Sequence, residues 1–590
     1  MPLSPVPNLA PTRRLIATAA LVALAVCAMM AWRQGDILRS LGDTDDAMRL
    51  VRVRELLAGQ GWFDQRMMRL QPPLGSVMHW SRLLDGALAA LDWLFARAAP
   101  APTAEWAMRF FWPLAWIGPA VACGLAVARR LGGASAVLIA AVLLLTDSQL
   151  YVQFRPGRID HHNIQIVMAM IAAACAIGGD GRARWAALGA LATALGLAIG
   201  IEALAFHALI GASYALRLVF DPKAARTAQA YGLMLAAAGA ALFLAQTPPD
   251  LWLTPVCDSL GVNLTLAMVI GGVGLVGAAS WTGVPFGGRL ALIGVVGVVA
   301  AGAYLAIDPN CLHGPAAEVA PVLRPIWLDR IQELRAWPAL WVLDRDAAVK
   351  SMVIVGMGVL AAAVLVMRRG PVDPSALLAA ALVVLAGLAA AQAFRLDDYA
   401  FWFGVPVIAA ALGMLVDRFG RGALVAALAS AVVLGPPSVT ALASVVFRTG
   451  GPQAKASAVA AADAAHDPCL ESKAYDDLAR LPAGVVLAPI DLGPFILAHT
   501  QSSALSAPYH RMAWGILAAH DALDTQVAGA EAKVRRLNVR YVVDCPTDQS
   551  QPRLGGLLDD LRRRDPPAWL KPLPSAGRAL KLYAVAPATP

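Results

Sequence analysis

The chain has 590 residues, of which 58% are hydrophobic and only 15% are charged, and its mean hydropathy is +0.61. Soluble domains are much less apolar, so most of this chain is expected to face lipid. The formal net charge is +8, but the basic residues form short clusters between apolar runs rather than one polar face. This pattern argues against nucleic acid as a partner and favours a polytopic α-helical membrane protein surrounded by membrane lipids.

The first apolar run, "LIATAALVALAVCAMMAW", follows the basic segment "MPLSPVPNLAPTRR". It is longer than the apolar core of a signal peptide and no clear cleavage site ends it, so we interpret it as a retained first helix. Runs of the length needed to cross ~30 Å of hydrocarbon number about thirteen. They lie near residues 14–32, 107–128, 131–146, 161–178, 184–200, 201–218, 226–246, 263–281, 289–307, 347–367, 375–394, 399–416 and 422–447.

Basic clusters predict the orientation of these spans. With a cytoplasmic N-terminus, clusters such as "MRRG" at 367–370 and "DRFGRG" at 417–422 all fall on the cytoplasmic side, as the positive-inside rule requires. An odd number of spans then places everything after about residue 448 outside, with the loops 33–106, 147–160, 247–262 and 308–346. We therefore expect an integral protein of the bacterial inner (plasma) membrane, with its chemistry on the extracytoplasmic face.

The composition changes at "RTGGPQAKASA", near residue 448, to that of a soluble domain. The segments "AGVVLAPIDLG", "VRYVVDCP" and "ALKLYAVAP" are typical of strands, and "KAYDDLARL" and "AGAEAKVRRLN" of helices. We predict a transmembrane core at 1–447, with its main external loops at 33–106 and 308–346, and a small extracytoplasmic α/β domain at 448–590.

Four cysteines fall in segments predicted to be external. Cys257 and Cys311 lie in two external loops, and Cys469 and Cys545 lie in the C-terminal domain. Since that compartment permits oxidation, we predict Cys257–Cys311 and Cys469–Cys545 disulfides. Spacing alone does not fix connectivity, and four unrelated thiols remain the alternative.

An acidic motif follows the first span. "GDTDDAMRLVRVRELLAGQGWFD" places Asp43, Asp45 and Asp46 within a few residues of one another. Carboxylates at this position suit a hard divalent cation, which positions phosphate groups. The alternative is an acidic N-cap for an interfacial helix.

A second polar motif, "RPGRIDHHNIQ", precedes the apolar run "IVMAMIAAACAI". If this segment enters a metal site in extended form, Asp160 and His162 alternate as ligands and His161 points elsewhere. Asp160 also stands where a helix N-cap would, and a cap needs no metal.

With both motifs predicted on the outer face, the chain resembles the catalytic subunit of oligosaccharyltransferase and, more broadly, membrane glycosyltransferases of the C-type (GT-C) fold. "DDAMRLVRVRELLAGQGWFD" is similar to that family's first-loop motif, and "DHH" to its second acidic motif. The resemblance implies a site for Mn²⁺ or Mg²⁺ formed by Asp45, Asp46, Asp160 and His162. It also implies that Asp46 is a catalytic carboxylate.

Two further residues are assigned by the same resemblance. Glu333 in "WLDRIQELRAW" matches a family glutamate that reaches the active site, and Arg395 in "AQAFRLDDYAFWF" matches an arginine that meets the lipid phosphate. The alternatives are a solvated helix face for Glu333 and a side chain extended to the interface for Arg395.

Three other polar residues are candidate substrate contacts. Glu202 lies between two apolar runs near the outer boundary, where a carboxylate is costly enough to suggest a role. A short wet loop would also accommodate it. His79 and His510 could contact sugar or lipid, although packing or surface roles are the more common alternative for such histidines.

The oligosaccharyltransferase family reads its acceptor peptide with a Trp-Trp-Asp motif, whereas Trp514 and Trp569 stand alone here. Peptide N-glycosylation is therefore not favoured. The resemblance still implies a lipid-linked sugar donor, specifically a polyprenyl-phosphate-linked one, and an acceptor that is a lipid, a glycan or a protein. The sequence has no Gly-rich nucleotide loop, which fits such a donor. The alternatives are a transporter with an acidic ion path and an envelope-assembly protein without transferase activity. Convergence of Asp46, Asp160 and His162 would support the enzyme, because a transporter spreads its acids through the membrane.

Overall fold

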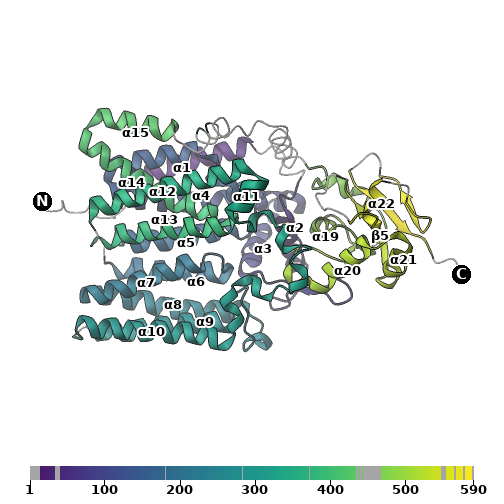
Figure 1. Cartoon of the computed structure of the whole chain (residues 1–590), viewed down its shortest axis with the longest axis horizontal. Helices are drawn as coiled ribbons and strands as arrows, with labels where there is room; N and C mark the ends of the chain where they lie inside the picture. The colour runs from purple at the N-terminus through teal and green to yellow at the C-terminus, as the bar shows by residue number, and fades with distance from the viewer. Residues whose placement is uncertain are drawn as a thin grey trace.

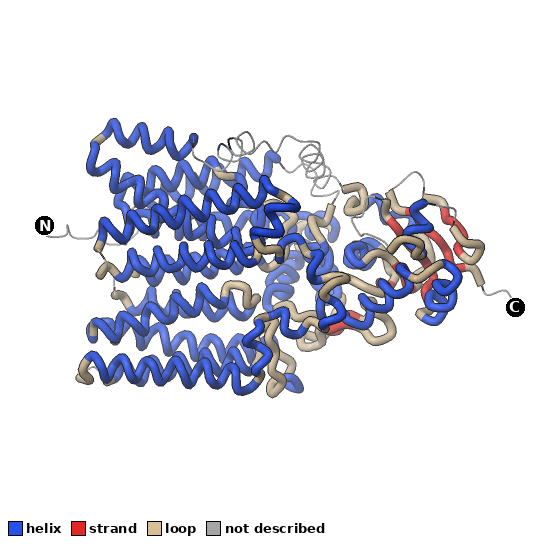
Figure 2. The backbone as a smooth tube through the Cα atoms, viewed as in Figure 1, coloured by secondary structure: helices blue, strands red, loops and turns tan. Residues whose placement is uncertain are grey.

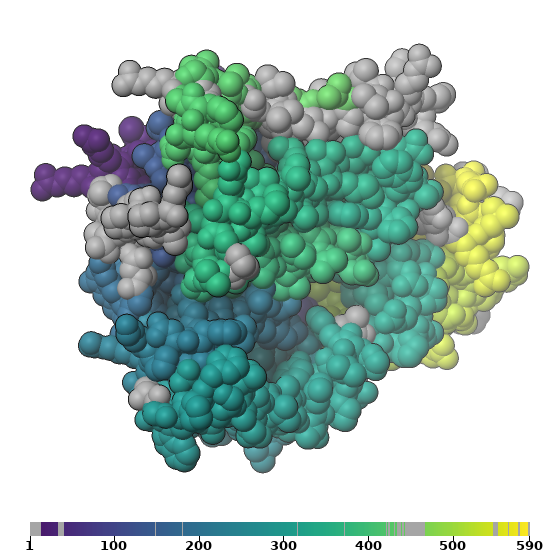
Figure 3. All heavy atoms as spheres, turned by 60° about the vertical axis from the view of Figure 1, so that its left-hand side comes forward, coloured from purple at the N-terminus to yellow at the C-terminus, as the bar shows by residue number. Residues whose placement is uncertain are grey.

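The computed structural model describes residues 13–33, 40–179, 181–281, 283–370, 372–433, 438, 442, 467–546, 553–563, 566–575 and 579–587. A bundle of roughly parallel and antiparallel helices forms one part of the molecule, and the larger of the two sheets lies in the C-terminal part at one end of that bundle (Figures 1 and 2). In Figure 3, which brings the opposite end of the bundle forward, the yellow C-terminal residues lie at the right-hand edge.

The bundle is built from the apolar segments of the sequence. Among the described residues, eight helices are long and apolar enough to cross a membrane. Four shorter apolar helices are also present, three of them in the bundle (His162–Gly178, Ala183–Ile199 and Leu204–Phe220) and one in the C-terminal region (Ile490–His499). The 13-residue helix Arg421–Val433 completes the bundle. The bundle helices are α1 (Arg13–Arg33), α4 (Ala101–Thr146), α5 (His162–Gly178), α6 (Ala183–Ile199), α7 (Leu204–Phe220), α8 (Ala225–Gln246), α9 (Val262–Ser280), α10 (Phe286–Ile307), α12 (Arg345–Arg369), α13 (Pro374–Gln392), α14 (Asp397–Phe419) and α15 (Arg421–Val433). The protein is thus polytopic and helical, and the number of crossings stays a prediction.

Helix α4 contains two of the predicted spans, 107–128 and 131–146. A straight helix of its 46 residues would be about 69 Å long, far more than a bilayer. The helix is broken at Gly133, whose φ of 74° lies in a region that residues with a Cβ avoid. Next to the break, a Cβ on Gly132 would come within 2.6 Å of the Cα of Ala410, so glycine also allows α4 to pack tightly on α14.

Two predicted boundaries fall outside the described residues. The span at 422–447 corresponds to α15 at its start, but most of its second half is not described. The boundary between 447 and 448 is not described either.

The long loops 33–106 and 308–346 gather at the end of the bundle that carries the C-terminal domain (Figure 1). The first contains α2 (Thr44–Leu57), α3 (Arg82–Ala96) and a hairpin of β1 (Arg66–Met67) with β2 (Ser76–Val77). The second consists mainly of short 3₁₀ turns, among them η7 (Leu328–Arg330) and η8 (Gln332–Leu334), followed by α11 (Trp337–Leu343).

The C-terminal region contains a five-stranded mixed sheet in the order β4-β3-β5-β7-β6. Strands β3 and β5 are parallel, whereas β7 runs antiparallel to β5 and β6. The strands are β3 (Val485–Leu487), β4 (Ser503–Ala504), β5 (Val539–Asp544), β6 (Leu570–Leu573) and β7 (Lys581–Val585), and the helices are α18 (Asp476–Ala479), α19 (Gly493–His499), α20 (Ala513–Asp524), α21 (Val527–Arg536) and α22 (Leu557–Arg563). The three segments predicted as strands correspond to β3, β5 and β7.

This region is fastened to the first long loop by backbone contacts. The amide of Ala504 donates to the carbonyl of Arg69 at 2.9 Å, and the amide of Gln71 donates to the carbonyl of Ala504 at 2.9 Å. The guanidinium of Arg69 also donates to the carbonyls of Leu497 and Thr500, both at 2.8 Å. These contacts place the C-terminal region directly over α2, where the first acidic motif begins.

Both predicted disulfides are confirmed. Cys257 is bonded to Cys311, and Cys469 is bonded to Cys545. The first bond connects the segment before α9 to the 308–346 loop, and the second ties the start of the C-terminal domain to the end of β5.

Candidate functional site

The first acidic motif forms the beginning of α2. Asp43 is the N-cap, and its side chain accepts the amides of Asp45 and Asp46, both at 3.0 Å. Asp46 accepts the amide of Asp43 in return, which completes a capping box. The cap interpretation therefore applies to Asp43 and Asp46, and the metal-site interpretation of this motif stays a prediction.

Asp46 connects the two motifs through its buried carboxylate. Its Oδ1 accepts the amides of Ile159 at 2.8 Å and Asp160 at 3.0 Å, and its Oδ2 accepts Arg158 at 2.9 Å. Arg158 also pairs with Asp43. Both oxygens of Asp46 are thus occupied by protein groups, and this residue does not line the cavity described below. Its neighbour Asp45 does, so the structure places Asp45 rather than Asp46 towards the open space.

The second motif differs from the extended segment that we expected. His161 takes helical backbone angles (φ −79°, ψ −16°) and is the N-cap of α5, which begins at His162. Asp160 is therefore not the cap residue. Because the chain already turns at His161, that imidazole does not point away: its Nδ1 contacts Asp160, and it lines the cavity.

Asp160 and His162 bring two potential ligand atoms together: Oδ2 of Asp160 and Nε2 of His162 are 3.1 Å apart. Within the described chain this buried oxygen accepts no hydrogen bond, whereas Nε2 of His162 also contacts Nη2 of Arg395 at 2.8 Å. Two atoms that bind one ion at about 2.1 Å, at right angles, are separated by about 3 Å, so the pair fits a divalent cation. Burial alone would raise the pKa of Asp160, but His161, His162 and Arg158 hold it well below its usual value, which keeps the ligand ionised.

Glu202 is at the centre of the polar cluster. Its Oε1 is 2.6 Å from Nη2 of Arg395, and its Oε2 is 3.2 Å from Nδ1 of His162. Metal-binding histidines commonly donate their second ring nitrogen to a carboxylate, and His162 has this partner. Glu202 lies in a short turn between α6 and α7, as the wet-loop alternative expected, but its carboxylate is paired with Arg395 and His162.

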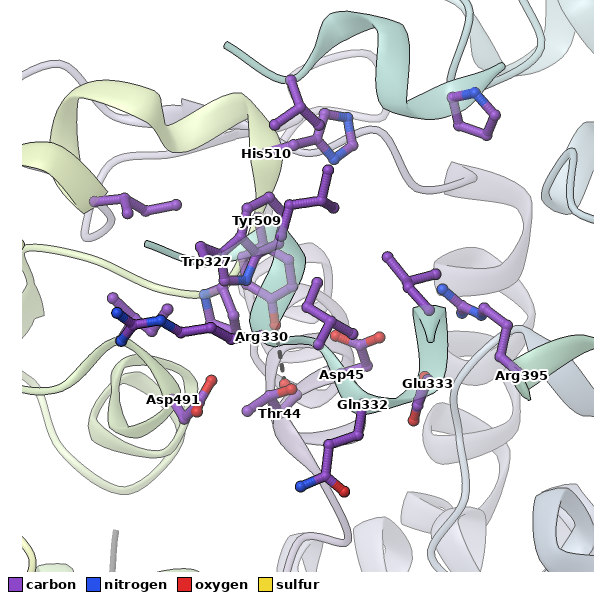
Figure 4. A pocket seen from close by; sticks show the side chains of 18 of the residues that line it. Thr44, Asp45, Trp327, Arg330, Gln332, Glu333, Arg395, Asp491, Tyr509 and His510 are labelled. Atoms are coloured by element: carbon purple, nitrogen blue, oxygen red, sulfur yellow. Dashed lines mark hydrogen bonds between the residues drawn. The ribbon is translucent and has the colours of Figure 1, made fainter. Parts of the chain in front are cut away.

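A cavity of about 1170 Å³ lies beside this cluster, and His161 is the residue of the second motif that lines it. Asp45, Glu202, Glu333 and Arg395 line it, together with His79 and His510. Figure 4 shows Asp45, Glu333 and Arg395 projecting into the same space from α2, η8 and η9 (Phe394–Leu396) respectively. The amide of Phe394 donates to the carbonyl of Arg335 at 3.1 Å, which holds the segment of Glu333 beside that of Arg395.

The electrostatics of Asp45 depend on its acidic neighbours. Burial, with the charges of Asp160 and Asp43, raises the pKa of Asp45 to about 7. A carboxyl group in this range changes charge near neutral pH, and a cation placed against it would favour the ionised form.

His79 and His510 meet each other on the cavity wall. Their ring centroids are 4.5 Å apart, and Nε2 of His510 lies 2.7 Å from Oδ2 of Asp258. These three residues form a second group whose ligand atoms could hold a metal. However, Arg511 occupies both oxygens of Asp258, at 2.8 and 2.5 Å, so the carboxylate is already paired with a cation.

Sequence reasoning missed several residues around the cavity. Asp85 is fully buried and accepts the guanidinium groups of Arg49 at 2.7 Å and Arg52 at 2.6 Å, beneath the first turns of α2. Tyr509 donates to the carbonyl of Thr44 at 3.0 Å. Arg158 was within the quoted "RPGRIDHH" motif, two residues before Asp160, so its charge beside that acid was an available signal. Nothing local in the sequence marked Asp85 or Tyr509.

No protein-family model and no curated protein sequence matches the chain. Solved structures of the oligosaccharyltransferase from Archaeoglobus fulgidus do match in fold. The apo form aligns with a TM-score of 0.66 at 14% identity, and the complex with an inhibitory peptide and a dolichol-phosphate with 0.64 at 13%; each alignment covers 90% of this chain and 69% of the archaeal one. A complex with Zn and sulfate gives 0.59 at 16% identity, covering 90% and 68%. The chain therefore has the GT-C fold of membrane glycosyltransferases, as its motifs indicated.

Proposed function

We propose that this chain is a metal-dependent glycosyltransferase that moves a sugar from a polyprenyl-phosphate-linked donor to a lipid, glycan or protein acceptor. The observation that carries the proposal is the meeting of two acidic motifs, Glu333 and Arg395 around one cavity at one end of a GT-C-like bundle. The core at 1–447 would bind the donor at the extracytoplasmic face of a bacterial inner membrane, and the domain at 448–590 would lie on that side.

In this proposal Asp160, His162 and Asp45 hold Mn²⁺ or Mg²⁺. The ion, when bound, would neutralise the phosphate oxygens of the donor. Asp46, which we expected among the ligands, instead positions the backbone of Asp160 through its hydrogen bond at 3.0 Å. Glu202 orients His162 by accepting its Nδ1–H.

The proposed transfer step assigns a role to each of these residues. The acceptor hydroxyl or amide attacks the anomeric carbon, the bond from that carbon to the phosphate oxygen breaks, and the phosphate leaves with the bonding electrons. Arg395 lines the cavity and would neutralise the charge on the leaving phosphate. Glu333, which projects into the same space, accepts the proton that the acceptor loses.

The transporter alternative is less well supported by this distribution of charge. An ion path needs acids spaced through the membrane, usually near its midplane. Here Asp45, Asp160, Glu202 and Glu333 all stand at the end of the bundle where the long loops gather. Such an arrangement suits a reaction at the membrane surface.

The test is a glycan comparison in a strain that lacks this gene. Mass spectrometry of lipid-linked sugars and envelope glycans should show the donor accumulating and one glycan lost, with recovery from a wild-type copy but not from an Asp160→Asn copy. Asp160→Asn should reach wild-type abundance in the membrane, because the shape of the side chain is nearly unchanged. Unchanged glycans in the deletion strain would refute the proposal.

A further inference from the structure

The C-terminal domain contributes directly to the cavity wall. Tyr509 and His510 line the cavity, and the hydroxyl of Tyr509 bonds to the carbonyl of Thr44, the residue before Asp45. Tyr509 is almost fully buried, with 3% of its surface exposed, and its ring meets that of Trp80 at a centroid distance of 5.2 Å. This part of the domain is therefore packed against the first turn of α2, where the proposed metal ligand stands.

A buried ion pair fastens the same segment to the membrane bundle. Asp258 lies just before α9, and Arg511 lies in the 3₁₀ turn His510–Met512 of the C-terminal domain. The guanidinium of Arg511 binds Asp258 through Nε at 2.8 Å and Nη2 at 2.5 Å, and His510 adds a third bond at 2.7 Å. A bidentate arginine–carboxylate pair constrains the relative orientation of the two side chains as well as the distance between them.

The pair is connected to the other walls of the cavity. Asp258 follows Cys257, whose disulfide to Cys311 holds the 308–346 loop that carries Glu333. His79, from the first long loop, contacts His510 with the two rings tilted by 50°. Four segments that are distant in the sequence thus meet at Asp258, and each of them lines the cavity.

We propose that Asp258 and Arg511 are positioning residues that hold Tyr509 and His510 against the catalytic cavity, so that the C-terminal domain is a required wall of the active site. The domain is then part of the enzyme rather than an appended module. This inference rests on the proposed transferase function for its activity readout, but the docking of the domain can be measured without it.

Charge pairing suits this role better than apolar contact. Apolar packing is compatible with many relative orientations of two surfaces. The planar guanidinium of Arg511 matches the carboxylate of Asp258 in one relative orientation only. Removal of Asp258 leaves Arg511 without this carboxylate, and removal of Arg511 leaves the carboxylate of Asp258, whose side chain is only 1% exposed, with His510 as its partner at 2.7 Å. The segment 509–511 should then detach from the wall while the fold of the domain persists, because its sheet and second disulfide do not involve this pair.

The experiment uses the full chain with Asp258→Asn, Arg511→Met and the double variant. Hydrogen–deuterium exchange of the protein in lipid nanodiscs should show faster exchange across 509–523 in all three, and complementation of the deletion strain should fall at least about tenfold in glycan yield. If the two residues act through each other, the double variant loses no more than about twofold beyond the worse single variant. Arg535→Met is the matched control, because Arg535 pairs with Glu531 on α21 at 2.7 Å, away from the cavity, and it should stay within about twofold of wild type.

Each other outcome overturns the inference. Unchanged exchange shows that the pair does not hold the segment. Faster exchange with full glycan yield shows that the wall is not required, and losses that multiply show that the two residues act separately. If wild type itself fails to restore any glycan, the transferase proposal fails, and the exchange measurement still decides whether Asp258 and Arg511 dock the domain.

Discussion

At the scale of single residues, the site depends on which of two adjacent aspartates faces the cavity. Successive residues of a helix are turned by about 100°, so Asp45 and Asp46 cannot share an environment. Asp46 faces inward and binds the backbone of 159–160, whereas Asp45 faces the open space. Asp45→Asn should therefore abolish Mn²⁺ binding and transfer with the melting temperature unchanged.

Asp46→Asn should instead lower the stability of the fold. It weakens a buried charge pair with Arg158, and such losses cost about 3–5 kcal/mol when one partner is removed outright. We expect a clear fall in melting temperature. Thermal unfolding and electron paramagnetic resonance of Mn²⁺ on both variants check these expectations, with Glu333→Gln as the control that loses transfer but keeps Mn²⁺ affinity. Equal metal loss in the Asp45 and Glu333 variants would contradict the assignment.

The raised pKa of Asp45 predicts that Mn²⁺ affinity depends on pH. Below about 7 the carboxyl group is protonated in the metal-free protein and cannot act as an anionic ligand, and above that value it is ionised. Mn²⁺ affinity should therefore rise as the pH increases through about 7, and the Asp45→Asn variant should lack this rise. Titration of Mn²⁺ from pH 5.5 to 8 measures it, and a flat wild-type profile would count against Asp45 as a ligand.

At the scale of elements, the 308–346 loop needs an external constraint because it consists mostly of short 3₁₀ turns. The Cys257–Cys311 disulfide supplies one at its start, and the contact between Arg335 and Phe394 supplies another near Glu333. Replacement of Cys257 and Cys311 by serine should lower transfer about tenfold while Mn²⁺ affinity stays unchanged, because the metal ligands lie on other elements. Cys27→Ser, at a free thiol in α1, is the control and should be neutral in the same glycan assay.

The break in α4 at Gly133 allows a second prediction about a single element. Gly133→Ala should destabilise the protein by about 1 kcal/mol or more, since a φ of 74° is unfavourable for a residue with a Cβ. Thermal unfolding in detergent checks this. Gly118→Ala, in the same helix and with open space at the Cβ position, should be tolerated.

At the scale of the whole molecule, the long loops, the cavity and the C-terminal domain share one end of the bundle (Figure 1). The positive-inside pattern predicts that this end is extracytoplasmic. A cysteine introduced at Arg553, in the C-terminal domain, should react with a membrane-impermeant maleimide in intact cells. One introduced at Arg368, at the far end of α12, should react only after lysis, and the reverse result would invert the orientation.

The sequence by itself determined the helical bundle. A segment that faces lipid must be apolar over its whole length and must form its backbone hydrogen bonds within itself, whatever it packs against. The sequence also located both polar motifs and both cysteine pairs, since the residue types that bind metals or form disulfides are few. Only the tertiary structure decided that Asp45 rather than Asp46 faces the cavity, that His161 stays beside Asp160, and that Glu202 meets Arg395. The physical reason is that side-chain direction and long-range pairing depend on where a helix begins and which helices adjoin it. Neither side-chain direction nor long-range pairing can be predicted from local composition.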